Sequence, residues 1–251
     1  MILELDCGNT RIKWRVLPAD GADPVLEGTA ETAAELRAQL DRLDGAPLRW
    51  CRIVSVRSDE ETRQLLDEVS RGGELRILQA SAAVRCAGVR NGYREYARLG
   101  LDRWLAILGG YHLAGKACLV IDLGTAVTAD LVSVDGQHLG GYICSGLPLM
   151  RAQLRGHTRR IRYEDGEAAQ AGGELLPGRS TAEAVERGCL LMLRGFVREQ
   201  CAAAGELLGG DFEVFLTGGD AALVADVWPQ SKCRPDLVFV GLALACPIER
   251  S

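Results

Sequence analysis

Met1-Ile-Leu-Glu-Leu-Asp6-Cys7-Gly8-Asn9-Thr10 opens the chain, and Cys118-Leu-Val-Ile-Asp122-Leu-Gly124-Thr125-Ala126 repeats its pattern near the middle. In both copies an apolar run ends in Asp-x-Gly with a small polar residue and leads into a second strand-like run. The Asp and the Gly recur at one common offset of 116 positions (122 − 6 and 124 − 8). A strand, a tight glycine turn and a returning strand predict a hairpin whose backbone N–H groups can face an anion. Two such hairpins indicate a duplicated domain with phosphate chemistry between the copies.

The overall composition is that of a globular protein with room for one large domain or two modest ones. The chain has 251 residues, of which 47% are hydrophobic and 25% charged. Its formal net charge of −5 argues against a general nucleic-acid or membrane-surface binder, because such proteins usually carry a basic excess. We therefore expect neither a nucleic-acid partner nor a membrane partner.

Nine cysteines lie singly along the chain, and none forms a C-x-x-C pair. Their odd number and their mostly apolar surroundings favour buried free thiols over disulfides or zinc. Glu4 and Asp6 interrupt the N-terminal apolar run, and no run reaches the roughly 18 residues of a membrane span, so neither a transmembrane helix nor a secretory signal is expected. The sequence thus predicts a cytoplasmic protein.

Apolar spacing, turn signals and capping residues predict a similar element order in both halves. The first half is expected to hold strands near 2–6, 12–16, 25–28, 52–56 and 74–78, with helices over about 32–43, 59–71 and 101–114. The second is expected to hold strands near 117–122, 127–134, 138–143, 213–217 and 237–240, with helices over about 147–156, 181–208, 220–227 and 241–246. Thr32, Ser58 and Ser180 each precede a glutamate by three residues, which predicts helix N-caps. We expect two domains, 1–115 and 116–251, and a mobile loop over 164–179.

The first hairpin is a candidate phosphate site. Gly8 lets the backbone approach a phosphate, Asn9 and Thr10 offer side-chain donors, and Lys13 adds positive charge. Asp6 offers a hard oxygen ligand for Mg²⁺, directly or through water. A plain hairpin turn is the alternative interpretation, and the second copy of the motif argues against it.

A second candidate is the start of the helix expected at 101–114. Asp102, in Gly100-Leu101-Asp102-Arg103, is placed by the helix N-terminus, where the helix dipole favours the ionised carboxylate. Such a group suits a base that accepts a hydroxyl proton during attack on a phosphoryl group. A capping aspartate beside a surface arginine is the alternative.

The second half carries three further candidates. Asp122 could bind a cation and Thr125 could donate to a phosphate oxygen, unless this copy has decayed into a packing element. Gly218 and Gly219, between a strand and a helix start, permit close approach of a nucleotide, although a tight turn would use them equally well. Thr181 follows the expected cap Ser180 and could contact a substrate. Gly110 to Ala117 nearly matches a P-loop, but it follows a helix and leads into a strand, which is the opposite order.

Taken together, these motifs resemble the type III pantothenate kinases, within the actin-like ATPase superfamily that includes sugar kinases and Hsp70. The resemblance spans almost the whole chain, and Gly-x-Asp-Arg after Tyr93 is its most specific part. It implies an α/β fold of two duplicated actin-like (ribonuclease H-like) domains, each a mixed five-stranded sheet with flanking helices. One position departs from the family pattern, because Tyr96 stands where many relatives carry proline.

The resemblance also implies roles for the candidate residues. Asp102 stands at the position of the proton acceptor. ATP would be bound at Asp6, Gly8, Asn9, Thr10, Lys13, Thr125, Gly218 and Gly219, and pantothenate at Tyr93, Gly100, Leu101, Asp102, Arg103 and Thr181. Mg²⁺ would be held near Asp6, and a monovalent cation, K⁺ or NH₄⁺, at Asp122. The family is dimeric with the pantothenate site completed at the subunit interface, so a homodimer is expected, and the helix at 181–208 is a candidate for that interface.

The expected activity is therefore ATP-dependent phosphorylation of pantothenate to 4′-phosphopantothenate, the entry step to coenzyme A. Three alternatives stay open at this point. They are a kinase for another small alcohol, a phosphohydrolase on the same fold, and a non-catalytic transcriptional accessory protein. Retention of Asp6, Asp102, Arg103 and Asp122 favours the enzyme, because a binding module has no need of all four.

Overall fold

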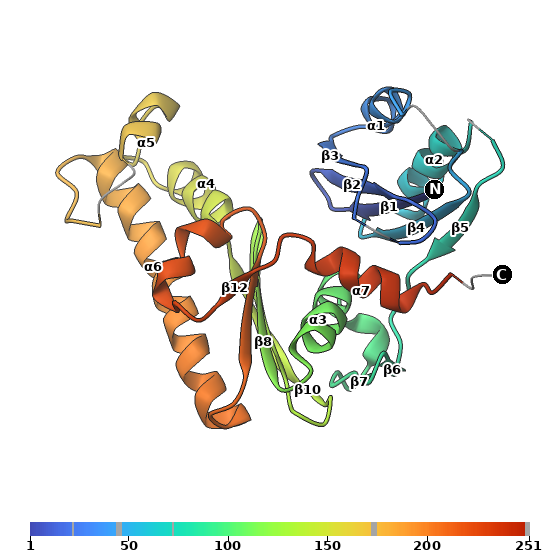
Figure 1. The fold of residues 1–251 in the computed structure, drawn as a ribbon. Helices are drawn as coiled ribbons and strands as arrows, with labels where there is room; N and C mark the ends of the chain where they lie inside the picture. Colours follow the sequence, from blue (N-terminus) through green and yellow to red (C-terminus); the bar gives the residue numbers. More distant parts are fainter. Residues whose placement is uncertain (22, 44–46, 72, 172–174, 249–251) are drawn as a thin grey trace. The chain divides into compact units, whose positions relative to one another are not determined.

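The chain forms two compact units, each with its own five-stranded sheet (Figure 1). The computed structural model describes residues 1–21, 23–43, 47–71, 73–171 and 175–248. Unit 1 consists of Met1–His112 together with Asp236–Ser251, and unit 2 consists of Leu113–Pro235. The chain therefore leaves unit 1 near the end of one helix and returns to it at the start of another.

The sheet of unit 1 has the strand order β3-β2-β1-β4-β5. Its strands are β1 (Ile2–Cys7), β2 (Ile12–Leu17), β3 (Leu26–Ala30), β4 (Trp50–Ser55) and β5 (Arg76–Gln79). The first three pair antiparallel, and β1, β4 and β5 pair parallel. Parallel neighbours need a crossover connection, which the helices supply.

The sheet of unit 2 repeats this topology as β10-β9-β8-β11-β12. Its strands are β8 (Cys118–Leu123), β9 (Ala126–Val132), β10 (His138–Ser145), β11 (Glu213–Thr217) and β12 (Lys232–Cys233). Again the first three strands pair antiparallel and the last two extend the sheet in parallel. The duplication predicted from the two Asp-x-Gly hairpins is thus confirmed, as is the α/β class with two mixed five-stranded sheets.

Seven α-helices lie in the described part of the chain: α1 (Ala33–Leu40), α2 (Asp59–Ser70), α3 (Leu101–Ala114), α4 (Leu147–His157), α5 (Asp165–Ala171), α6 (Thr181–Leu208) and α7 (Leu237–Ala245). The three predicted caps are confirmed, since the side chains of Thr32, Ser58 and Ser180 each accept a hydrogen bond from the backbone N–H three residues later. Within the ranges that the structure describes, no helix has both the length and the apolar character needed to cross a bilayer.

One face of each sheet carries a hydrophobic core. In unit 1, Leu3, Leu5 and Cys7 alternate along β1 and are buried with Leu36 of α1 and Leu65 of α2. In unit 2 the long helix α6 lies along the sheet (Figure 1) and shares its core with β8, β9 and β11. Because strand side chains alternate between faces, the even-numbered residues of β1 point to the opposite face.

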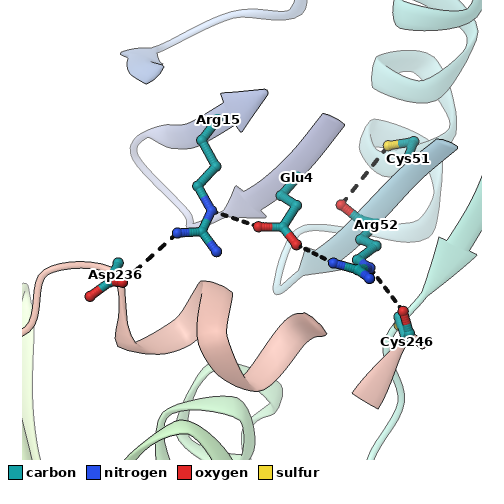
Figure 2. Close-up of polar contacts among 6 residues, drawn as sticks. All are labelled: Glu4, Arg15, Cys51, Arg52, Asp236 and Cys246. Atoms are coloured by element: carbon teal, nitrogen blue, oxygen red, sulfur yellow. Dashed lines mark hydrogen bonds and ion pairs between the residues drawn. The ribbon is translucent and has the colours of Figure 1, made fainter. Parts of the chain in front are cut away.

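That opposite face of β1 carries a buried ionic network (Figure 2). Glu4 is fully buried and lies directly across from Arg15 on β2 and Arg52 on β4. Arg15 Nε donates to Glu4 Oε2 at 2.6 Å, and Arg52 Nη1 donates to Glu4 Oε1 at 2.7 Å. Arg52 Nε also donates to the carbonyl of Cys246 at 2.9 Å, and Arg15 Nη1 lies 3.8 Å from Asp236 Oδ2. The network thus ties both ends of α7 to the sheet of unit 1.

The predicted strand at 237–240 is wrong, because these residues form the first turn of α7. The run Leu237–Ala245 is apolar almost throughout, so its pattern does not separate a buried strand from a buried helix. Tertiary packing decides the matter: Gly241 allows α7 to approach the backbone of Leu105 on α3, where an added Cβ would collide. The structure also differs from the expected division into 1–115 and 116–251, since α7 belongs with unit 1.

Three smaller expectations also differ from the structure. The helix expected at 220–227 is two 3₁₀ turns, Ala221–Leu223 and Ala225–Val227. Part of the loop expected at 164–179 forms α5, while positions 172–174 lie outside the described residues. The short strands β6 (Arg85–Cys86) and β7 (Val89–Arg90) form a hairpin that was not predicted, because two-residue strands leave too short a pattern to detect.

Candidate functional site

The first phosphate-loop candidate is a short connection between β1 and β2 in unit 1. Asp6 and Lys13 lie directly across from each other in the antiparallel register, so both side chains are on the same face beside the loop. Asn9 and Thr10 are exposed at its tip. A Cβ at Gly8 would lie 3.3 Å from the carbonyl oxygen of Arg11, so a larger residue there would crowd the turn. The predicted side chains are therefore gathered around one hairpin.

Arg57 fixes this loop from outside, and the sequence analysis did not single it out. Its Nε donates to the carbonyl of Gly8 at 2.8 Å, and the backbone N–H of Val56 donates to the carbonyl of Cys7 at 3.1 Å. The link runs from the end of β4 to the end of β1, two parallel strands that finish at the same edge of the sheet. Only the pairing of these strands could have indicated it.

Asp102 lies in the first turn of α3, half-buried, also in unit 1. Its Oδ1 accepts a hydrogen bond from the backbone N–H of Arg103 at 2.8 Å. A Cβ at Gly100 would lie 2.8 Å from the same oxygen, so glycine is what lets the chain enter the helix with the carboxylate in this position. The helix N-terminus favours a negative charge there. The local geometry thus explains why a glycine stands two residues before the aspartate in the Gly-x-Asp motif.

Tyr93 and Arg103 form a pair beside Asp102. Arg103 Nη1 donates to the Tyr93 hydroxyl at 2.7 Å, and the guanidinium carbon lies 5.5 Å from the centre of the Tyr93 ring. Arg103 is buried, with 7% of its surface exposed, while Tyr93 and Leu101 are half-buried and Tyr96 is exposed. The structure therefore brings together Tyr93, Gly100, Asp102 and Arg103, as the sequence analysis expected.

The second phosphate-loop candidate connects β8 to β9 in unit 2. Asp122 lies across from Thr128 and Leu123 lies across from Val127. Gly124 and Thr125 connect the end of β8 to the start of β9. Thr125 is exposed, and its carbonyl accepts a hydrogen bond from the backbone N–H of Gly146 at 3.0 Å. This contact joins the loop to the start of α4.

Gly218 packs directly on that loop. Its φ of +87° suits glycine, and a Cβ there would lie 2.5 Å from Asp122 Oδ1 and from the carbonyl carbon and oxygen of Leu123. The backbone N–H of Asp220 then donates to the carbonyl of Leu123 at 3.0 Å. Asp122, Thr125 and Gly218 therefore belong to one local cluster, with Gly219 exposed beside it.

A polar network lies close to this cluster and was not predicted. Burial raises the pKa of Asp220, and the charge of Arg151 on α4 partly opposes that shift. Arg151 Nη2 forms a 2.6 Å ion pair with Glu186 Oε2 on α6, and the Tyr163 hydroxyl donates to Glu186 Oε1 at 2.9 Å. Burial and this bond raise the pKa of Tyr163 to about 12. The network ties α4 to α6, the helix that begins at Thr181.

Thr181 is the first residue of α6 and is exposed, with Ser180 as the cap before it. Its helix start is held by Gly178, where a Cβ would collide with the backbone of Ala184. No described residues form a cluster of three or more His, Cys, Asp or Glu side chains suited to a metal ion. A nucleotide-bound Mg²⁺ needs no such cluster, since one or two carboxylates and the phosphates are enough.

Comparison with known proteins identifies the family. The sequence profile of the type III pantothenate kinases matches residues 2–203. A type III pantothenate kinase from Pseudomonas paraeruginosa (strain DSM 24068 / PA7) is 64% identical over 249 residues, which cover 99% of this chain and 100% of that protein.

Solved structures agree with the fold. A Campylobacter jejuni protein described as a Baf family transcriptional activator superposes with a TM-score of 0.57 at 16% identity, covering 96% of this chain and 94% of its own. A ROK family glucokinase from Streptomyces griseus, solved with glucose and AMPPNP, gives 0.50 at 15% identity, covering 96% and 97%. The fold is thus that of the actin-like sugar kinases, and the profile and the sequence identity show that the chain belongs to the type III pantothenate kinase family.

Proposed function

We propose that this chain transfers the γ-phosphoryl group of ATP to the primary hydroxyl of pantothenate, with Asp102 as the proton acceptor. Family membership supports the reaction. The observation that carries the role of Asp102 is its carboxylate at the start of α3, held beside Gly100 and next to the buried Arg103. A carboxylate in this setting can orient the hydroxyl and take its proton as the oxygen attacks phosphorus.

Pantothenate is itself a carboxylate, so its binding needs a fixed positive group. Arg103 supplies one, and its guanidinium is held against Tyr93 by a hydrogen bond and by ring contact. A planar guanidinium suits a carboxylate because it offers paired N–H donors. In the proposal Tyr93, Gly100, Leu101 and Arg103 bind pantothenate, and Thr181 contributes from the start of α6.

The two Asp-x-Gly hairpins are proposed to bind the ATP phosphates. Backbone N–H groups at Gly8 and Gly218, with the donors of Asn9, Thr10 and Thr125 and the charge of Lys13, suit polyphosphate oxygens. Gly219 completes the loop in unit 2. Mg²⁺ would be held near Asp6, where a single carboxylate beside a phosphate loop fits its preference for oxygen ligands. When bound, the ion would neutralise charge on the phosphates.

Asp122 is proposed to hold a monovalent cation, K⁺ or NH₄⁺. Its carboxylate lies against Gly124 and Gly218, where backbone carbonyls are close by as further oxygen donors. Phosphoryl transfer depends mainly on positioning and charge neutralisation, and both loops serve that purpose. The residues present therefore fit both ions.

A homodimer and a cytoplasmic location complete the proposal. The adjacent residues Leu191 and Met192 of α6 are 50% and 67% exposed, and such large exposed apolar side chains suit burial against a second copy. All nine cysteines are free thiols, as expected in a reducing compartment.

The test is a coupled ATP assay on the purified enzyme with and without pantothenate and with a panel of other small alcohols. Asp102→Asn keeps the size of the side chain and removes the base, so turnover should fall by about 10²–10⁴-fold. Asp59→Asn is the matched control, because Asp59 also lies in the first turn of a helix and is exposed. Near-normal turnover of Asp102→Asn, or equal turnover with another alcohol, would overturn the assignment. Replacing K⁺ by Na⁺ tests the role of Asp122 in the same assay.

A further inference from the structure

We propose that Asn91 is a positioning residue that sets Tyr93, and through it Arg103, for binding of the substrate carboxylate. The inference deepens the proposed function and rests on it, since it concerns the same pantothenate segment. Within the described residues Asn91 makes no hydrogen bond to Asp102 or Arg103, and its role is to fix the loop that carries Tyr93.

Asn91 is buried, with 7% of its surface exposed, although its neighbours Arg90 and Gly92 are both exposed. Its side-chain Oδ1 accepts a hydrogen bond from the backbone N–H of Tyr93 at 3.0 Å. Its Nδ2 donates to the carbonyl of Tyr96 at 3.3 Å and to the carbonyl of Ala83 at 3.4 Å. Its own backbone N–H donates to the carbonyl of Val84 at 3.0 Å. The Asn91 side-chain amide thus joins Ala83, which precedes β6, to the backbone of Tyr93 and to the 3₁₀ turn Tyr96–Arg98.

The contacts continue from Tyr93 to the proposed site. The Tyr93 hydroxyl accepts a hydrogen bond from Arg103 Nη1, and the backbone N–H of Arg103 donates to Asp102 Oδ1. A tyrosine hydroxyl lies at the far end of a rigid ring, so a small rotation of the Tyr93 backbone moves it by a larger distance. Fixing the Tyr93 N–H is therefore an effective way to fix the guanidinium that the hydroxyl meets.

Position 91 needs a side-chain amide because this group must accept a hydrogen bond from the Tyr93 N–H and donate hydrogen bonds to two backbone carbonyls. Aspartate has the same shape and can still accept from the Tyr93 N–H, but it would turn a negative oxygen toward the carbonyls of Ala83 and Tyr96. Two donated bonds would be lost, and a buried charge would be left facing two acceptors. Asn91→Asp thus disturbs the loop without changing the volume of the side chain.

The test compares steady-state kinetics of the full-length enzyme with Asn91→Asp, Tyr93→Phe and the double variant. For Asn91→Asp we expect the KM for pantothenate to rise by about tenfold, the equivalent of one or two lost hydrogen bonds, while the KM for ATP changes less than twofold. In the Tyr93→Phe background the hydrogen bond between the hydroxyl and Arg103 is already missing, so the added effect of Asn91→Asp on the KM for pantothenate should fall below about threefold.

Gln39→Glu is the matched control. Gln39, also in unit 1, accepts a hydrogen bond from Trp14 Nε1 at 2.9 Å and donates to the carbonyl of Thr29 at 3.1 Å, so its amide plays the same double role away from the substrate segment. This variant should lower the melting temperature without raising the KM for pantothenate.

Three results decide the matter. A selective, non-additive rise in the KM for pantothenate supports the inference. A lower melting temperature with unchanged KM, as in the Gln39 control, overturns it and leaves Asn91 a stabilising residue only. Hydrogen exchange at residues 93–104 is a measurement that needs no turnover, and faster exchange there in Asn91→Asp supports the positioning role. If the wild-type enzyme fails to phosphorylate pantothenate while this exchange result holds, only the proposed function is refuted.

Discussion

Replacing Glu4 by Gln should destabilise unit 1 strongly, because Glu4 is the shared counter-charge of two buried arginines. Glu4 is fully buried, and the side chains of Arg15 and Arg52 are only 12% and 11% exposed. Removing one member of a buried ion pair typically costs about 3–5 kcal/mol, because the remaining charge stays buried without compensation. Glutamine can accept from one guanidinium, but its NH₂ group would face the other.

The solvent exposure of the two arginines determines where in this range the loss of unfolding free energy for Glu4→Gln falls. A cavity of about 700 Å³ in unit 1 is lined by both arginines, so water can reach parts of their guanidinium groups. Solvation of this kind lowers the penalty, and we expect a loss of about 3 kcal/mol, the lower end of the range. For a chain of this size that corresponds to a fall in melting temperature of roughly 6–12 °C.

The assay is urea unfolding followed by tryptophan fluorescence, since Trp14 and Trp50 both lie in the sheet of unit 1. Glu68→Gln is the control, because it breaks the Arg71–Glu68 ion pair on the surface, where the Arg71 side chain is 71% exposed. That loss should stay within about 0.5 kcal/mol. If Glu4→Gln costs no more than the control, cavity water solvates the arginines fully and the ionic network does not hold α7 to the sheet.

Two further predictions test the loop in unit 2 and the state of the cysteines. Gly218→Ala should raise the KM for ATP and lower the free energy of unfolding by about 1–3 kcal/mol, because a Cβ at φ +87° would lie 2.5 Å from Asp122 Oδ1. In the control Gly219→Ala the new Cβ meets no atom within 4 Å, so the free energy of unfolding should change by less than about 0.5 kcal/mol. Equal effects of the two substitutions would refute the packing argument. Burial raises the pKa of Cys118 to about 12, so its thiol stays protonated and should resist iodoacetamide in the native enzyme up to about pH 9. The exposed Cys233 should be labelled under the same conditions. Mass spectrometry of both peptides checks this, and rapid labelling of Cys118 in the native enzyme would contradict it.

Much of the secondary structure of this protein could be predicted from its sequence, because it depends on local interactions. Strand alternation and the repeated Asp-x-Gly turn predicted both hairpins, and the caps at Ser58 and Ser180 predicted the start of two helices, because each signal involves residues only a few positions apart. Asp102 and Arg103 lie in the first turn of α3 and Gly100 directly precedes it, so their grouping also followed from spacing alone.

Contacts between distant parts of the chain were decided only by the tertiary structure. The segment at 237–245 became a helix of unit 1 because α3 accepts it closely and because Arg52 donates to the carbonyl of Cys246, a residue 194 positions away. Arg57 on Gly8 and Arg151 on Glu186 are likewise pairings across elements, which no local pattern contains. Sequence alone determined where the chain turns, caps and alternates, whereas burial and long-range polar partners determined which faces meet, since their free energy exists only once the chain has folded.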